Sequence, residues 1–183
     1  MESLRGHLLV ATPQLPDPNF AKSVVLLIQH TQEGALGVVL NRPIGKTVED
    51  LWQQVSDESC SCQEQVYMGG PVSGPLLALH TDKRRAELEI FPGVYLAAQK
   101  ANLDALVGQQ KHRFRVFLGN AGWGEGQLES ELEQGAWLTT AATLDYVFYD
   151  DEDLWQEVAK HIGNSMLFST LKIKHRPEDP SVN

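Results

Sequence analysis

The chain has 183 residues, of which 42% are hydrophobic and 21% are charged, a composition typical of one globular domain. Its 15 lysines and arginines are outnumbered by 24 acidic residues, so the net charge is −9. This balance disfavours direct nucleic-acid binding, because few cations are present to displace counterions from phosphates. The longest aliphatic run, Val24 to Ile28, is far too short to span a membrane.

The N-terminus and the cysteines favour a cytoplasmic protein. The apolar stretch from Leu8 to Ala11 is shorter than the apolar region of a signal peptide. Cys60 and Cys62 are the only two cysteines, and no further Cys or His cluster completes a four-ligand metal site. We therefore expect two incidental thiols in a solvated loop, no metal and no cofactor. A metal-binding or redox role for this pair is the alternative.

Short apolar runs predict strands in the first part of the chain, at residues 7–11, 23–29 and 35–40. A helix is predicted next, because Thr47 is a good N-cap with Asp50 three residues later. Four apolar residues follow at helical spacing and predict one buried face: Val48, Leu51, Trp52 and Val55.

The second part of the chain mixes strands and helices. Strands are predicted at 66–68, 76–80, 87–91, 94–97, 113–118 and 136–139, and helices at 100–110, 127–134 and 151–162. Gly163 is expected to end the last helix, and the tail from about 174 to 183 is expected to be irregular. These elements predict a single α/β (α+β) domain over residues 1–183, with a mixed sheet flanked by helices.

The most informative segment, residues 119–132, joins a predicted strand to a predicted helix and contains Trp123 among four glycines. Helical spacing pairs Gln127 with Glu131, and Glu129 with Glu133. The loop could cradle an anion on helix amides, or a glutamate could act as an acid, a base or a cation ligand. The alternative is a structural turn, in which Trp123 fills the core and the glutamates are solvated.

Other positions give weaker signals. Gly69-Gly70-Pro71 could form a second wall of a cleft, although by itself the tripeptide predicts only a turn. Asn41-Arg42 follows a predicted strand, where the asparagine could cap the backbone or contact a ligand. His30 and His80 each end a predicted strand and are expected to be structural histidines, with a metal pair as the alternative. The sequence contains no Gly-x-Ser-x-Gly, no His-Glu-x-x-His and no catalytic Cys–His signature.

A small basic cluster precedes the glycine-rich segment and could contact an acidic partner. It comprises Lys111, His112, Arg113 and Arg115. Alternation along a strand would place the two arginines on one face.

The chain resembles the YqgE/AlgH family of bacterial proteins. The resemblance rests first on Gly-Trp-Gly-Glu-Gly-Gln-Leu-Glu-Ser-Glu-Leu at 122–132. It extends to His-Leu-Leu-Val-Ala-Thr-Pro at 7–13, Gly-Ala-Leu-Gly-Val-Val-Leu-Asn-Arg-Pro at 34–43, and Gly-Gly-Pro-Val at 69–72. It implies a cytoplasmic α/β protein with a strongly bent, partly barrel-like sheet. The family's biochemical activity is not established, and some members are labelled transcriptional regulators.

The sequence leaves three functional hypotheses. The first is a binding or regulatory protein with a cleft for an unknown small molecule or a cytosolic protein. The second is an enzyme acting on an anionic or nucleotide-like substrate at the glycine–tryptophan loop. The third, direct DNA binding, is disfavoured by the net charge and the lack of a helix-turn-helix pattern. The candidate cleft residues are Asn41, Arg42, Gly69, Gly70, Pro71, Gly122, Trp123, Gly126, Gln127, Glu129 and Glu131.

Overall fold

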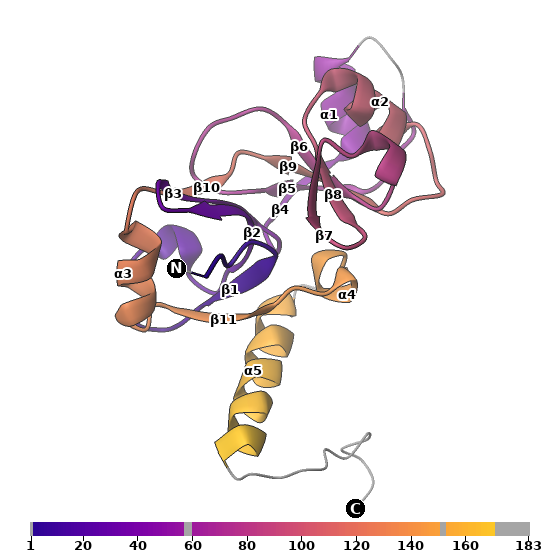
Figure 1. The fold of residues 1–183 in the computed structure, drawn as a ribbon. Coiled ribbons are helices and arrows are strands. Elements are labelled where there is room, and N and C mark those ends of the chain that lie inside the picture. The colour runs from indigo at the N-terminus through magenta and orange to yellow at the C-terminus, as the bar shows by residue number, and fades with distance from the viewer. Residues whose placement is uncertain (1, 57–59, 151–152, 171–183) are drawn as a thin grey trace, which may run out of the picture.

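The computed structural model describes residues 2–56, 60–150 and 153–170, whose strands form two β-sheets (Figure 1). The strands of the first sheet are β1 (His7–Ala11), β2 (Val24–Thr31), β3 (Gly34–Val39), β10 (Ala121–Trp123) and β11 (Trp137–Ala141). Their spatial order is β10-β3-β2-β1-β11, and every pair is antiparallel.

The second sheet is mixed, as the sequence predicts. Its strands are β4 (Pro43–Thr47), β5 (Gln65–Met68), β6 (Leu77–His80), β7 (Leu88–Phe91), β8 (Val94–Ala97) and β9 (Phe114–Leu118). Their order is β4-β5-β9-β6-β8-β7, and only the β5–β9 pair is parallel. The mixed α+β fold is therefore confirmed, with the described strands divided between two sheets that do not close into a barrel.

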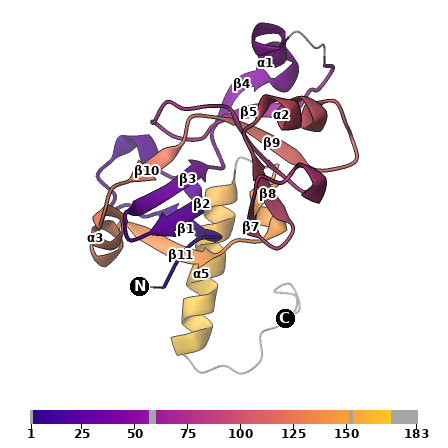
Figure 2. The ribbon, with the colours of Figure 1, turned by 45° about the horizontal axis from the view of Figure 1, so that its top comes forward.

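Helices cover the outer faces of both sheets (Figures 1 and 2). Helices α1 (Val48–Val55) and α2 (Lys100–Val107) pack on the second sheet, and α3 (Gln127–Glu133) packs on the first. The short α4 (Leu144–Val147) leads towards α5 (Leu154–Thr170), which begins beside β1 and β11 and then extends away from the sheets.

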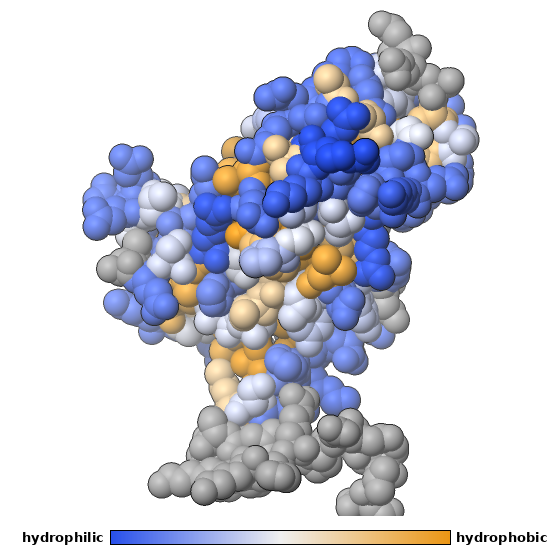
Figure 3. All heavy atoms as spheres, turned by 45° about the vertical axis from the view of Figure 1, so that its right-hand side comes forward, coloured by the Kyte–Doolittle hydropathy of each residue, from blue (hydrophilic) through white to orange (hydrophobic). Residues whose placement is uncertain are grey.

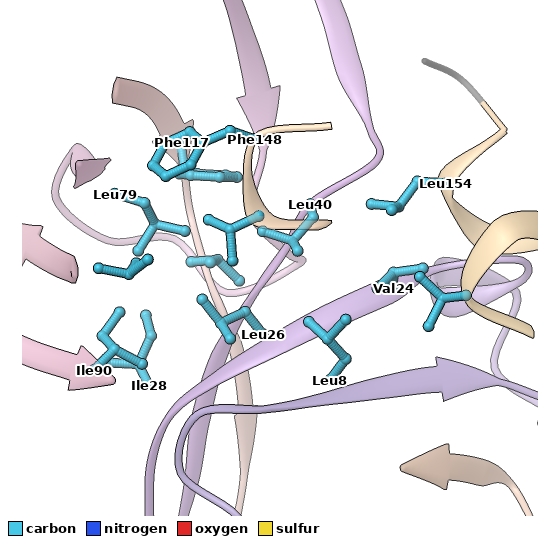
Figure 4. Close-up of a cluster of buried hydrophobic side chains, with 14 of the residues drawn as sticks. Leu8, Val24, Leu26, Ile28, Leu40, Leu79, Ile90, Phe117, Phe148 and Leu154 are labelled. Atoms are coloured by element: carbon cyan, nitrogen blue, oxygen red, sulfur yellow. The ribbon is translucent and has the colours of Figure 1, made fainter. Parts of the chain in front are cut away.

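The central core lies between the two sheets (Figure 4). Leu8 and Leu26 of the first sheet point towards Leu79 and Phe117 of the second, and α5 adds Leu154. Alternate residues of the same strands face outward into two further clusters, one under α3 and one under α1 and α2. Because alternate residues of the central strand β2 face two different clusters, this strand needs an almost continuous apolar run.

Local signals set the helix ends in part. Thr47 and Asp50 form the predicted capping box, in which each side chain bonds the other residue's backbone N–H. Two expectations are wrong. Val55 is 47% exposed, because α1 ends there, and Gly163 lies inside α5, which continues to Thr170. A glycine costs a helix only about 1 kcal/mol, and no proline follows before Pro177.

The surface on one side of the molecule is mainly hydrophilic, with small hydrophobic patches between polar residues (Figure 3). Within the described ranges, no helix has both the length and the apolar character needed to cross a membrane.

Candidate functional site

The aromatic residue of the glycine-rich loop belongs to the core. Trp123 in β10 is only 6% exposed. Its ring lies 6.1 Å from that of Phe20 and 6.0 Å from that of Trp137, measured between centroids. Leu128 of α3 is buried in the same cluster. Of the two interpretations that the sequence leaves open for Trp123, its position therefore fits the core plug.

Glu131 organises the polar groups around this aromatic cluster. Its Oε2 accepts hydrogen bonds from the indole nitrogens of Trp123 at 2.9 Å and Trp137 at 2.8 Å. Its Oε1 accepts a bond from the Gln127 amide at 3.0 Å, and the Gln127 Oε1 accepts one from the Gly124 backbone. These residues satisfy one another, so buried indole N–H groups keep acceptors where water is excluded.

Glu129 faces a histidine that the sequence did not connect with it. Its Oε1 lies 2.7 Å from Nε2 of His30, at the end of β2. The backbone N–H of Leu4 donates to His30 Nδ1 at 2.9 Å, so Nε2 carries the proton and donates to the carboxylate. This hydrogen bond lowers the pKa of Glu129 below its ordinary value. The contact joins α3 to β2, and the bond from Leu4 adds the N-terminal segment.

Of the other glycines of the loop, Gly126 serves the turn into α3 and Gly122 belongs to β10. Gly126 has a φ of +69°, a left-handed conformation that favours glycine, and it precedes the first residue of the helix. Gly122 is exposed in β10 and lies next to the Val72 side chain.

A second cluster of glycines forms the junction between the sheets. A Cβ on Gly69 would lie 2.3 Å from the carbonyl oxygen of Gly119, and one on Gly70 would lie 2.3 Å from the carbonyl of Asn120. The Gly69 carbonyl also accepts a hydrogen bond from Val39 of the first sheet at 2.8 Å. Two backbones approach too closely here for any side chain, which explains why glycine is needed.

A hollow of about 500 Å³ opens beside this junction. Arg42, Gly70 and Pro71 line it, together with Met68 and Val72. Met68 is 41% and Val72 46% exposed, so two apolar side chains border the hollow in contact with solvent. The Arg42 guanidinium donates one hydrogen bond, from Nη2 to the Ala21 carbonyl at 2.9 Å.

Asn41 acts on the backbone rather than in the hollow. Its Oδ1 accepts a hydrogen bond from the Val24 N–H at 2.9 Å, and its Nδ2 donates to the Lys22 carbonyl at 2.9 Å. Lys22 has a φ of +54°, unusual for a residue with a side chain. The asparagine therefore holds the turn that leads into β2, as the backbone-capping alternative predicts.

Comparison with known proteins places the chain in a family. The model of the AlgH-like family matches residues 8–167. The chain belongs to this family. A UPF0301 protein of Myxococcus xanthus is 38% identical over 168 residues, covering 89% of this chain and 93% of the relative. A UPF0301 protein of Xanthomonas campestris is 39% identical over 169 residues, covering 87% and 89%.

Solved structures agree with the fold. The solution structure of the AlgH protein from Pseudomonas aeruginosa matches with a TM-score of 0.71 and 31% identity, covering 96% of both chains. A crystal structure from Corynebacterium diphtheriae has the same TM-score at 24% identity, covering 88% of this chain and 87% of that one, a likeness of fold alone.

In this AlgH-like chain the predicted cleft residues fall into separate places. Arg42, Gly70 and Pro71 line the hollow, and Gly69 is buried beside it. Trp123, Gln127 and Glu131 form the aromatic cluster with its hydrogen bonds, and Glu129 pairs with His30. The sequence missed Met68 and Val72, whose apolar character next to glycines is the signal that could have found them.

The described residues show no arrangement typical of a metal site or of a reactive cysteine. No group of three or more His, Cys, Asp and Glu side chains converges there. Cys60 and Cys62 are half-buried and pack against the cluster under α1 and α2, whereas Ser61 and Gln63 beside them are exposed, so the expected solvated loop holds two partly covered thiols. Burial raises the pKa of the Cys62 thiol, which lowers its reactivity.

Proposed function

We propose that this AlgH-like chain is a cytoplasmic regulatory protein that binds a segment of a protein partner in the hollow beside the Gly69–Gly70 junction. The observation that carries the proposal is the pair of apolar side chains, Met68 and Val72, left in solvent at the rim of a concave surface. Exposed apolar residues around a hollow are typical of protein-interaction sites. Methionine adapts its shape to different partners.

The walls of the hollow fit an extended segment with an acidic group. Gly70, Gly74 and Gly119 line it, so a partner can approach the backbone closely. Arg42 has further N–H donors beyond its bond to Ala21, and these can hold a carboxylate. The volume of the hollow also lies within the range of small-molecule sites, which makes a metabolite the competing outcome of the test.

The same geometry gives the enzyme hypothesis little support. Glu131 holds two indoles and an amide, and Glu129 holds His30, so both carboxylates are committed to contacts within the protein. Helix α3 has seven residues, and its first turn is tied to the loop by Gln127. The net charge of −9 also disfavours a nucleic-acid partner.

The test selects peptides from a random library on the purified protein and measures the affinity of the selected peptides by fluorescence anisotropy. We expect apolar peptides with one acidic residue. Met68→Glu should weaken their binding by about ten-fold or more, because it places a charge in an apolar contact. The matched control is Met166→Glu, since Met166 is 52% exposed on α5, far along the chain from the hollow.

Two outcomes would overturn the proposal. One is that no peptide is selected, while a thermal-shift panel of nucleotides, sugar phosphates and carboxylic acids gives a hit that Met68→Glu abolishes. The other is that Met68→Glu and Met166→Glu bind the selected peptides equally. Circular dichroism on both variants checks that each is folded.

A further inference from the structure

A second and larger hollow, of about 1,140 Å³, lies beside β9 and outside the proposed partner site. The basic cluster recognised in the sequence lines it: Lys111, His112, Arg113 and Arg115. The opposite wall includes the segment that starts at α4, with Asp145 and Asp150. The expected alternation holds, because both arginines face this segment and form ion pairs with it.

Arg115 is a buried cation that the protein holds rigidly. Its side chain is only 5% exposed, and its guanidinium lies 4.3 Å from the centre of the Tyr67 ring. Nη2 donates to the Tyr149 carbonyl at 2.8 Å, and Nη1 donates to the Leu40 carbonyl at 3.4 Å. Stacking and two backbone acceptors fix the position of the charge before any ligand arrives.

The anions that face these cations are held much less firmly. Asp150 accepts a bond from Arg115 Nη2 at 3.1 Å, yet its side chain is 89% exposed. Asp145 lies 3.8 Å from Arg113, and its side chain is 90% exposed. Ion pairs with such exposed carboxylates contribute little free energy, so another anion can replace them at low cost.

We propose that this hollow is a binding site for a small organic molecule that carries two anionic groups, phosphates or carboxylates. The two groups replace Asp145 at Arg113 and Asp150 at Arg115. Because the arginines are two residues apart on an extended chain, their Cα atoms are about 6.6 Å apart, which suits two anionic groups on one small molecule. Lys111 has no carboxylate within salt-bridge distance among the described residues and adds charge to the same wall.

The test measures binding of two pairs of compounds by isothermal titration calorimetry at constant ionic strength. Fructose 1,6-bisphosphate is compared with fructose 6-phosphate, and citrate is compared with acetate. Fructose 1,6-bisphosphate should bind at least about ten-fold more tightly than fructose 6-phosphate, and citrate at least about ten-fold more tightly than acetate. The reason is that a second charge-assisted contact forms. Tighter binding of fructose 1,6-bisphosphate than of citrate then indicates a phosphate ligand, and the reverse order indicates a carboxylate ligand.

Three variants assign the contact without removing the buried arginine. The Arg113 side chain is 59% exposed, and Arg113→Gln should abolish the difference in affinity between the two compounds of each pair. Asp150→Asn should tighten binding several-fold, because it removes the internal competitor. Lys46→Gln, at an exposed lysine of β4 that lines neither hollow, should leave probe binding unchanged. Failure here is separate from failure of the partner site, because the two hollows share no lining residue.

The proposal is overturned if neither fructose 1,6-bisphosphate nor citrate binds at millimolar concentration. It is also overturned if the Arg113→Gln variant binds each compound with the same affinity as the unmodified protein. A lower affinity of the Asp150→Asn variant would overturn it too. In those cases the arginines serve only to join the start of β9 to the segment that begins at α4.

Discussion

The aromatic cluster at α3 and the basic hollow beside β9 both place charged groups next to aromatic rings, but they treat those charges differently. In the cluster, Glu131 receives hydrogen bonds from Trp123 and Trp137, whose side chains are buried. In the hollow, Arg115 is buried and its carboxylate partner Asp150 is exposed. The partners of Glu131 belong to packed elements, so this charge serves the fold. The carboxylate that faces Arg115 is exposed and contributes little free energy, and on this difference rests the proposal that a ligand anion can take its place.

In the most conspicuous motif of the sequence, the hydrogen bonds of Trp123, Gln127 and Glu131 all lie within the protein. Glycines, a tryptophan and glutamates in one loop are also what a ligand site would need, and residue types cannot separate the two. Four substitutions test how far these contacts stabilise the fold.

The largest effect is expected for Glu131→Ala. This change leaves two buried indole N–H groups without acceptors and should lower the free energy of unfolding by about 3 to 5 kcal/mol. Urea unfolding followed by tryptophan fluorescence measures it. Glu133→Ala is the matched control, since Glu133 is exposed on the same helix and should change stability by less than about 0.5 kcal/mol. Equal effects of the two changes would mean that the cluster does not depend on its carboxylate.

Gly69→Ala is expected to have the next largest effect. A methyl group would lie 2.3 Å from the Gly119 carbonyl oxygen, so the two backbones must separate at the junction of the sheets. We expect a loss of about 1 to 3 kcal/mol, measured by thermal unfolding. Gly45→Ala is the comparison, because a Cβ there meets nothing within 4 Å and only the backbone conformation is strained. A smaller loss at Gly69 than at Gly45 would contradict the close approach.

Glu129→Gln should cost about 1 kcal/mol, because the bond from His30 loses its charged acceptor. The effect depends on pH. Since the folded protein lowers the pKa of Glu129, its contribution is complete above the ordinary glutamate pKa of about 4.3 and is lost as the pH falls below that value. Unfolding measured between pH 7 and pH 3 should therefore show a smaller decline in the variant. An identical pH dependence in both proteins would rule out the pairing.

The smallest effect has the opposite sign. Gly163→Ala should raise the free energy of unfolding by about 0.5 to 1 kcal/mol, because Gly163 lies inside α5 with open space around it. Thermal unfolding would detect the rise. A loss of stability instead would place Gly163 at a helix end, as its sequence context alone suggests.

Much of the secondary structure is readable from the sequence. Residues 7–11 were predicted as a strand and are β1, and Thr47 starts α1 with the predicted capping box. Both signals are local, since they depend on alternation or on two side chains three residues apart. The resemblance to the YqgE/AlgH family was readable for the same reason, because its motifs are short and continuous.

Tertiary structure decided the elements and contacts whose partners lie far away in the chain. Strands β4 and β10 and helix α4 were missed, because each is short and depends on neighbours brought in by the fold. His30 and Glu129 are 99 residues apart in sequence, and Gly69 meets Gly119 only where the two sheets join. Local sequence signals therefore predict most of the strands and helices, and the family that the chain resembles. Only the packing of two sheets decided that Trp123 fills the core and that Arg42 lines a hollow, because burial depends on what lies opposite each residue.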